Sequence, residues 1–345
     1  MAEGEARASD ARRAMPGAEP HTMSVVIPVY QGEDTLPALL DELAGHLEPR
    51  ITPDGHAYLV SEVLLVYDNG PDGSAATIRS LAAKHDAVRA VWLSRNFGQH
   101  AATLAGMASS GGDWIVTMDE DGQHDPADIP RFLDAAMREQ ATLVYALPTN
   151  PAPHGFLRNG ASRAAKWTFE HLLRGGEAAN FHSYRLILGE VGRSAAAYAG
   201  AGVFLDVAIS WVNRRTAYCG AALRAEGDRR SGYSARGLLS HFWRMVLSSG
   251  TRGLRVVSIL GVTFAALGAI LAGYIVVAKI VGSVDQPGWT SLVVIVLLTS
   301  GTILFSLGIL AEYIGVAVNM AMGKPLYLIG GDPQDGPLGR AAPPR

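Results

Sequence analysis

Short runs of apolar and β-branched residues alternate with longer polar-apolar stretches between residues 23 and 147. Five of these runs have the length of β-strands, and they are 24–30, 62–67, 88–93, 114–118 and 142–147. Strands that alternate with helices are typical of a parallel sheet whose strands are joined by crossover helices. The pattern therefore predicts an α/β fold whose first helix begins near Thr35.

Polar residues follow each of the first four predicted strands, beginning at Gln31, Asp68, Ser94 and Asp119. Ligands of open α/β sheets bind beyond the carboxyl ends of the strands, so these stretches form the candidate site. The second stretch, 68–73, is also rich in Asp, Asn, Gly and Pro, which favour tight turns. This stretch is therefore either a tight turn or a ligand contact, and the sequence does not decide between the two.

Two long runs near the C-terminus contain no charged residue: 256–278 and 286–311. Each exceeds the about 20 residues that a helix needs to cross the hydrocarbon core of a membrane. The short link between them is rich in turn residues, so the two predicted spans form a tight hairpin. Two buried helices of a soluble protein are the alternative, but uncharged runs this long are uncommon there.

Basic residues flank the predicted spans on one side: Arg244, Arg252 and Arg255 precede the first span, and Lys324 follows the second. Positively charged flanks of membrane spans stay in the cytosol. The pattern predicts a multi-pass protein of the inner (plasma) membrane with a cytosolic N-terminal domain. Residues 1–22 lack the apolar stretch of a signal peptide, and we expect a disordered tail there.

The stretch just before the first predicted span is amphipathic. Arg and Ser recur at four-residue intervals beside an apolar stripe, at Arg236, Ser240, Arg244 and Ser248 against Leu239, Phe242, Trp243 and Val246. Such a helix lies at a membrane surface with its basic side near lipid phosphates. Packing of this helix on the N-terminal domain is the alternative.

Composition limits the function without assigning one. A chain of 345 residues has room for one domain of about 200 residues or more plus an appendage. The net charge of −3 does not favour nucleic acid as a partner. The single cysteine, Cys219, excludes an intramolecular disulfide, and we interpret it as a small core residue, with a reactive thiol as the alternative.

Four carboxylates follow the fourth predicted strand within seven residues: Asp119, Glu120, Asp121 and Asp125. Their mutual repulsion is costly unless a positive charge compensates it, and oxygen ligands of this kind suit Mg²⁺ or Mn²⁺. An extended Asp-x-Asp segment sends both aspartate side chains to the same side. The cluster predicts a divalent cation site, with an ordinary solvated loop as the alternative.

Three motifs together carry a resemblance to a known family. They are Ser-Val-Val-Ile-Pro-Val-Tyr at 24–30, Ser-Arg-Asn-Phe-Gly-Gln-His-Ala-Ala at 94–102 and Asp-Glu-Asp-Gly-Gln-His at 119–124. The chain resembles family 2 glycosyltransferases of the GT-A fold, in the branch of bactoprenol glucosyltransferases and dolichol-phosphate mannosyltransferases. The resemblance covers most of the chain and implies a nucleotide-sugar-binding domain followed by the transmembrane hairpin.

The resemblance also implies roles for individual residues. The nucleotide-sugar donor is bound by Pro28, Tyr30, Glu33, Asp68, Asp119, Asp121 and Gln123. Three of these, Asp119, Asp121 and Gln123, hold the Mg²⁺ or Mn²⁺ ion. Asp121 and Arg185 are the expected catalytic residues. The residues expected to bind the acceptor phosphate are Arg158, Arg163, Arg229, Arg230 and Ser231. Solvent-exposed side chains without a ligand are an equally good interpretation of Arg229 and Arg230.

The chain departs from the family pattern at three places. Gly232 stands where the family usually has a lysine that contacts the acceptor. His182 and Ser183 replace the Gly-Asp pair that often precedes Arg185, which weakens the transfer of a catalytic aspartate. Tyr67 stands beside Asp68 where the family often has Asn or Asp.

The implied reaction is inverting transfer of a sugar from a nucleotide-sugar, with UDP favoured, to polyprenyl phosphate. The phosphate has a second pKa of about 6 and arrives largely as an anion, so it has little need of a general base. Metal and arginines would stabilise the departing diphosphate. Transfer to another membrane lipid and a non-catalytic membrane scaffold are the alternatives. The expected partners are the nucleotide-sugar, the polyprenyl phosphate, the membrane and further copies of the chain in a homo-oligomer.

The expected domain organisation follows from these segments. It comprises a tail at 1–22, a GT-A catalytic domain at 23–234, an interface helix at 235–252, spans at 253–281 and 288–318, and a cytosolic tail at 319–345.

Overall fold

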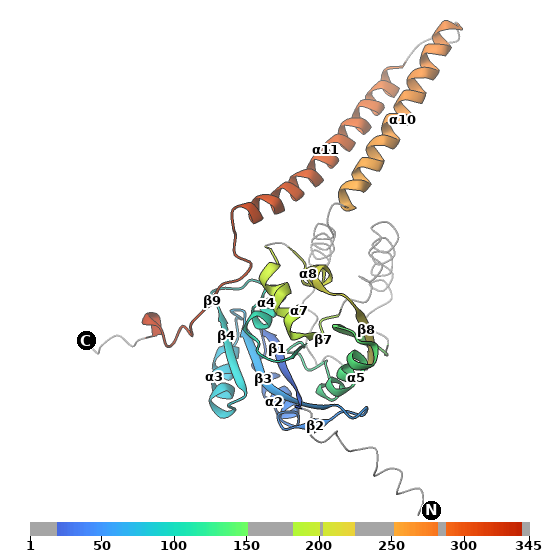
Figure 1. Cartoon of the computed structure of the whole chain (residues 1–345). Coiled ribbons are helices and arrows are strands. Elements are labelled where there is room, and N and C mark those ends of the chain that lie inside the picture. Colours follow the sequence, from blue (N-terminus) through green and yellow to red (C-terminus); the bar gives the residue numbers. More distant parts are fainter. Residues whose placement is uncertain (1–18, 151–181, 201–202, 225–251, 282–287, 340–345) are drawn as a thin grey trace, which may run out of the picture. The chain divides into compact units, whose positions relative to one another are not determined.

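The computed structural model describes residues 19–150, 182–200, 203–224, 252–281 and 288–339. The chain divides into two compact units. The first comprises 1–160, 180–232 and 325–345, and the second comprises 161–179 and 233–324. Within the described residues the first unit is a mixed sheet with helices on both faces, and the second contains two long helices (Figure 1).

All five predicted strands are present: β1 (His21–Val29), β3 (Ala57–Tyr67), β4 (Val88–Leu93), β5 (Trp114–Thr117) and β6 (Leu143–Pro148). The sheet also contains β2 (Arg50–Ile51), β7 (Arg185–Leu188), β8 (Thr216–Ala221) and β9 (Ile329–Gly330). The strand order is β8-β6-β7-β5-β1-β3-β4-β9, and β2 pairs with β3. The predicted α/β fold is thus confirmed.

The sheet is mixed rather than wholly parallel. β1 pairs in parallel with β3 and β5, and β3 pairs in parallel with β4. β7 lies between β5 and β6 and runs antiparallel to both. At the outer edge β9 runs antiparallel to β4. The carboxyl ends of β1, β3, β4, β5 and β6 therefore meet at one edge, where β7 begins.

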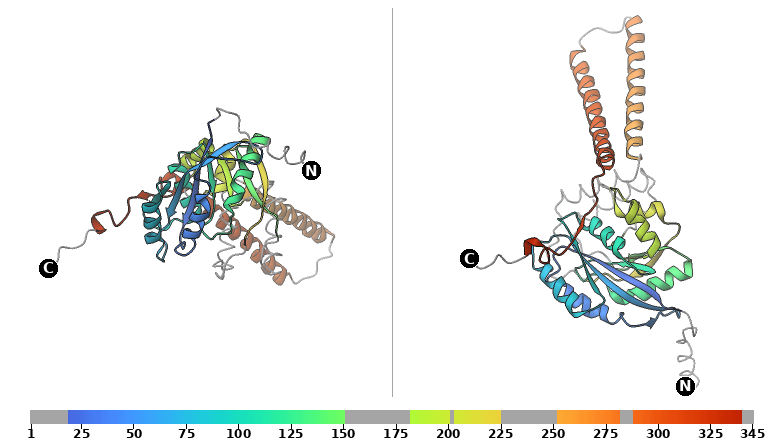
Figure 2. Two further views of the ribbon diagram at one scale, coloured as in Figure 1. Left: turned by 90° about the horizontal axis from the view of Figure 1, so that it is seen from below. Right: turned by 60° about the vertical axis from the view of Figure 1, so that its left-hand side comes forward.

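Helices cover both faces of this sheet, as Figure 2 shows. One face packs against α2 (Leu36–Ala44), α3 (Ser74–Lys84) and α5 (Ile129–Glu139). The other packs against α4 (Gln99–Ser109), α7 (Gly189–Tyr198) and α8 (Leu205–Val212). Two short 3₁₀ helices complete the described part, η2 (Pro126–Asp128) and η4 (Pro337–Gly339).

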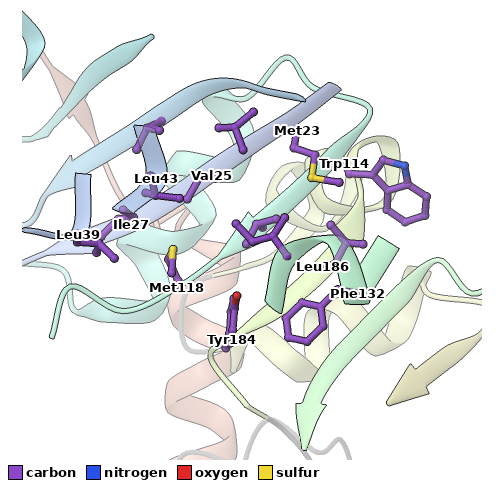
Figure 3. Packing of buried hydrophobic residues seen from close by; sticks show 14 of the residues in the cluster. Met23, Val25, Ile27, Leu39, Leu43, Trp114, Met118, Phe132, Tyr184 and Leu186 are labelled. Carbon is purple, nitrogen blue, oxygen red and sulfur yellow. The ribbon is translucent and has the colours of Figure 1, made fainter. Parts of the chain in front are cut away.

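The core consists of two apolar layers, because successive side chains of a strand point to opposite faces. On β1, Val25 and Ile27 join the layer under α2, α3 and α5, and Val26 joins the layer under α4, α7 and α8. Figure 3 shows the first layer, where Phe132 and Tyr184 pack beside the strands. This packing holds the strand ends, and hence the candidate site, on a rigid support.

The second unit contains α10 (Arg252–Ile280) and α11 (Trp289–Ala321), which contact each other. The stretch Leu298–Ala321 of α11 is long and apolar enough to cross a membrane, and its most apolar part is not buried within the structure. In α10 the apolar stretch found is the shorter Gly261–Leu271. The second predicted span is therefore supported, and the first stays a prediction.

Candidate active site

The polar stretches that follow β1, β3, β4 and β5 are linked to one another by hydrogen bonds. Glu120, after β5, binds the backbone of the loop after β1. Asp68, after β3, binds the backbone of the loop after β4. Gln99, at the start of α4, donates a hydrogen bond to Asp119. The four strand ends thus form one connected candidate site, as their positions along the sequence predict.

Both carboxylate oxygens of Asp119 accept hydrogen bonds. Gln99 Nε2 lies 2.6 Å from Oδ1, and Ser183 Oγ lies 2.6 Å from Oδ2. Burial raises the pKa of Asp119, while the bonds from Ser183 and Gln99 and the charge of Arg185 act in the opposite direction. Ser183 is one of the residues at which the chain departs from the family pattern, and its hydroxyl orients Asp119.

His124 fixes the backbone at the start of the acidic loop, which is the stretch 119–125 after β5. Its Nδ1 accepts the N–H of Asp119 at 2.9 Å, so the ring proton sits on Nε2 in the neutral form. Burial lowers the pKa of His124 to about 4, and its ring stacks on Tyr184 at 4.8 Å. The neutral ring is therefore the form present near pH 7, and its contacts are structural.

Glu120 was not predicted to have a role, because the Asp-x-Asp pattern leaves its middle position free. Its two oxygens accept the N–H groups of Tyr30 and Gln31, both at 2.9 Å. The approach is close, since a Cβ on Gly32 would lie 2.8 Å from Glu120 Oε2. The expected extended Asp-x-Asp segment is a turn at residues 120–121, so strand alternation gave no signal for the position of Glu120.

Arg224 contacts the acidic loop with both its backbone and its side chain. It was not predicted from the sequence. Its backbone N–H donates to Gln123 O at 3.0 Å. Its guanidinium pairs with Asp125 at 2.9 Å and with Glu42 of α2 at 2.7 Å. The arginine thereby compensates one of the four clustered carboxylates. Within the loop, Gln123 N–H donates to Asp121 Oδ1 at 3.0 Å.

A group of three or more His, Cys, Asp or Glu side chains able to hold a metal ion is not present in the described part of the chain. The predicted set contains only two such residues, Asp119 and Asp121, with Gln123 as the third ligand. Mg²⁺ usually takes one or two protein carboxylates and completes its shell with water and substrate phosphates. The predicted metal site therefore stays a prediction.

Asp68 is 3% exposed and binds the protein rather than solvent. Its oxygens accept the N–H groups of Phe97 at 2.7 Å and Gly98 at 2.8 Å. Burial raises the pKa of Asp68, and these two bonds oppose the rise. The turn interpretation of this stretch is supported by Gly70, since a Cβ there would lie 1.5 Å from Tyr30 O.

Three further residues expected to bind the nucleotide, Pro28, Tyr30 and Glu33, differ in burial and in contacts. Glu33 Oε2 accepts the N–H of Gly73 at 2.8 Å, which joins the loops after β1 and β3. Pro28 is buried within β1 opposite Val66 of β3. Tyr30 is 43% exposed at the carboxyl edge. Direct nucleotide contacts of these residues stay predictions.

Arg185 is 3% exposed at the start of β7 and forms a buried ion pair with Asp206 of α8. Asp206 also accepts the hydroxyl of Tyr145 at 2.8 Å. Burial raises the pKa of Asp206, and Arg185 opposes the rise. The charge of Arg185 lowers the pKa of Asp119. Asp206 was not predicted, because its partners come from β6 and β7, far away along the chain.

The expected acceptor residues lie outside the described residues. They are Arg158, Arg163, Arg229, Arg230 and Ser231. Residues 235–251 of the expected interface helix lie outside them as well. The structure therefore describes the residues expected at the donor and not those expected at the acceptor phosphate.

Most of the chain is similar in sequence to known proteins. The chain matches glycosyl transferase family 2 over residues 24–196. The undecaprenyl-phosphate 4-deoxy-4-formamido-L-arabinose transferase of Aeromonas hydrophila subsp. hydrophila is 31% identical over 320 residues, covering 89% of this chain and 92% of that protein. The enzyme of the same name from Pseudomonas paraeruginosa is 30% identical, with 89% of each chain covered.

Solved structures similar to this chain include glucosyl-3-phosphoglycerate synthase from Mycobacterium tuberculosis, in complex with Mn²⁺, UDP and glucosyl-3-phosphoglycerate. It is 18% identical, with a TM-score of 0.45 over 70% of this chain and 86% of that one. The sequence match carries the assignment: the chain belongs to glycosyl transferase family 2 and is a glycosyltransferase of the GT-A fold.

Proposed function

We propose that this enzyme transfers a sugar from a nucleotide-sugar, preferably a UDP-sugar, to polyprenyl phosphate with inversion at the anomeric carbon. The observation that carries the proposal is the match to undecaprenyl-phosphate sugar transferases over 89% of the chain. The connected strand ends support it, because they place Tyr30 beside the acidic loop at the carboxyl edge of the sheet.

The residues of the acidic loop fit a divalent cation. From the described residues, each oxygen of Asp119 accepts one hydrogen bond, which leaves each oxygen a further lone pair toward them. Asp121 and Gln123 add only oxygen ligands of the kind that Mg²⁺ and Mn²⁺ prefer. When bound, the ion would neutralise charge on the departing diphosphate. We assign the metal to Asp119, Asp121 and Gln123.

The chain's own residues then have separate tasks. Gln99 and Ser183 hold the carboxylate of Asp119 in one orientation. Arg185, fixed by Asp206, supplies a buried positive charge whose field reaches Asp119. The acceptor phosphate brings its own negative oxygen, so positioning and charge neutralisation are the main requirements.

The long helices fit an acceptor that stays in the lipid phase. α10 has 29 residues, or about 43 Å at 1.5 Å per residue, which is enough to cross a membrane. We place the catalytic unit on the cytosolic side of the plasma membrane, because Arg252, Arg255 and Lys324 flank the hairpin at its catalytic-unit ends. Homo-oligomers stay a prediction.

The direct test incubates the full-length protein with Mg²⁺ or Mn²⁺, a polyprenyl phosphate and a panel of UDP-, GDP- and dTDP-sugars. We expect one donor class to give a lipid-linked sugar. The Asp121→Asn variant should lose about 100-fold or more in turnover, because it removes charge at the leaving group. Asp86→Asn, an exposed position between α3 and β4, is the matched control and should keep full turnover.

Failure of every donor to give a lipid-linked product would refute the proposal, as would full turnover by Asp121→Asn. Product on another lipid acceptor, with none on polyprenyl phosphate, would assign the enzyme to a different acceptor class.

A further inference from the structure

The segment that follows α11 returns to the catalytic unit and joins its sheet. This return segment, residues 325–335, contains β9, whose Gly330 and Ile329 pair with Trp92 and Leu93 of β4. Figure 1 shows β9 beside β4 at the outer edge of the sheet. Just beyond the strand pair, Ser94 N–H donates to Leu328 O at 2.9 Å. The return segment is therefore part of the sheet.

Side chains of the return segment hold it in place on both sides of β9. Before the strand, Leu326 and Tyr327 pack against the apolar layer that includes Val91 and Leu93. After it, Asp332 receives two hydrogen bonds from Arg79 of α3, Nε to Oδ2 and Nη2 to Oδ1, each at 2.6 Å. Two parallel bonds of this kind fix both position and direction.

The ion pair is partly shielded from solvent. The side chain of Asp332 is 10% exposed, and that of Arg79 is 26% exposed. The guanidinium of Arg79 also lies 4.8 Å from the ring centroid of Trp92, in β4. Hydrogen bonds from Arg79 hold the pKa of Asp332 below its usual range. Arg79 thus joins α3, β4 and the return segment.

The strand end that the return segment binds leads directly into the candidate site. Leu93 O accepts a hydrogen bond from Asn69 Nδ2 at 2.5 Å, which ties β4 to the turn after β3. Four residues further, Phe97 and Gly98 donate their N–H groups to Asp68. The loop 94–98 is thereby held between Asp68 on one side and the return segment on the other.

The same loop controls the position of Asp119. Gly98 has a φ of 92°, a left-handed value that favours glycine, and it precedes α4. Gln99, the first residue of α4, donates to Asp119 Oδ1. Displacement of loop 94–98 would therefore move Gln99, which donates a hydrogen bond to Asp119 in the acidic loop.

We propose that the return segment positions loop 94–98 and, through it, the donor side of the active site, with Asp332 as its positioning residue. This inference rests on the proposed use of a nucleotide-sugar donor. A purely structural role, in which β9 only covers an open sheet edge, predicts a different result. In that case loss of the ion pair lowers stability without a selective effect on the donor.

The test uses full-length protein in detergent or nanodiscs with the Asp332→Asn variant. Hydrogen exchange of the peptides that cover residues 93–99 should become faster than in the wild type. The KM for the donor should rise about threefold to tenfold while kcat stays within about twofold, because a lost charge-assisted pair weakens positioning rather than chemistry. Arg79→Lys, which keeps the charge but loses the planar fork, should give an intermediate result.

The matched control is Asp54→Ala, which removes an exposed ion pair to Arg138 at 3.8 Å elsewhere in the unit. It should change neither exchange at 93–99 nor the donor KM. The double variant Arg79→Asp/Asp332→Arg should recover part of the lost KM effect.

Unchanged exchange at 93–99 in Asp332→Asn would overturn the inference whatever the activity of the protein. Faster exchange with an unchanged donor KM would mean that the return segment only covers the edge of the sheet. That result would also overturn the inference. An inactive wild type would instead refute the proposed function, because the exchange measurement does not depend on the donor.

Discussion

Several carboxylates of the candidate site bind backbone groups of neighbouring loops. Asp68 holds Phe97 and Gly98, Glu33 holds Gly73, and Glu120 holds the loop after β1. A carboxylate that accepts backbone N–H groups fixes a loop without needing a partner side chain. The acidic residues of this site are therefore positioning devices as well as candidate ligands.

Substitution of Glu120 tests this at the level of one residue. In Glu120→Gln the side chain keeps one acceptor oxygen, but its amide NH₂ faces the second backbone N–H. We expect the donor KM to rise about threefold to tenfold, because hydrogen bonds to charged groups contribute about 1.5–3 kcal/mol and solvent replaces part of the loss here. Steady-state kinetics with varied donor is the measurement.

The control for this substitution is Glu139→Gln, at the exposed end of α5. Equal donor KM values for Glu120→Gln, Glu139→Gln and the wild type would show that Glu120 does not position Tyr30.

At the scale of elements, β1, β3, β4, β5 and β6 were predicted from the sequence, and β2, β7, β8 and β9 were not. β4 has the predicted bounds, and β1, β3, β5 and β6 differ from prediction mainly at their ends. β2 and β9 have two residues each, too few for a periodic pattern to stand out. β7 has four residues, as many as β5, and β8 has six, so length alone does not explain why these two strands were missed. Their existence depends on neighbouring strands that arrive from other parts of the chain.

A buried network joins β1, β3 and the loop before β5 away from the site. Glu62 accepts Ser24 Oγ at 2.6 Å and Gly111 N–H at 2.6 Å, and it pairs with Arg89 of β4. Burial favours a higher pKa for Glu62, but the bonds from Ser24 and Gly111 and the charge of Arg89 outweigh it and lower the pKa. The ionised form is therefore the one that stabilises the fold.

This network predicts a pH dependence of stability. A carboxyl group with a lowered folded pKa stabilises the fold above its unfolded pKa, and this contribution is lost as pH falls through the folded pKa. Glu62→Gln should lower the free energy of unfolding by about 1–3 kcal/mol near pH 7. The difference from the wild type should shrink as pH falls below about 4.5.

Thermal unfolding of the full-length proteins in detergent, measured from pH 7 to pH 4, checks this expectation. Glu48→Gln, an exposed position before β2, serves as the control and should follow the wild type. A difference between Glu62→Gln and the wild type that stays constant over this range would contradict the assignment.

At the scale of the whole molecule, the chain leaves the catalytic unit, forms α10 and α11, and returns to complete the sheet. The sequence predicted the two helices within a few residues, as 253–281 and 288–318 against Arg252–Ile280 and Trp289–Ala321. It gave no sign that the stretch after α11, interpreted as a tail, contains β9.

The proposed hairpin topology can be tested by thiol labelling in a Cys219→Ser background, since Cys219 is the single cysteine. Ser283→Cys, in the link between the helices, should react with a membrane-impermeant maleimide in intact cells. Lys324→Cys should react only after the cells are permeabilised, because its flank is cytosolic. Labelling of both positions in intact cells, or of neither, would contradict the hairpin.

The sequence by itself determined five of the nine strands of the described sheet, the two long apolar helices and the family motifs, because each rests on local periodicity or on contiguous residues. Tertiary structure alone decided the insertion of β7, the docking of β9 and the partners of Ser183, Arg185 and Glu120. Asp332 and Arg79 are separated by 253 positions. Contacts between residues so far apart in the sequence depend on which strands become neighbours in the sheet. A local sequence pattern does not predict this.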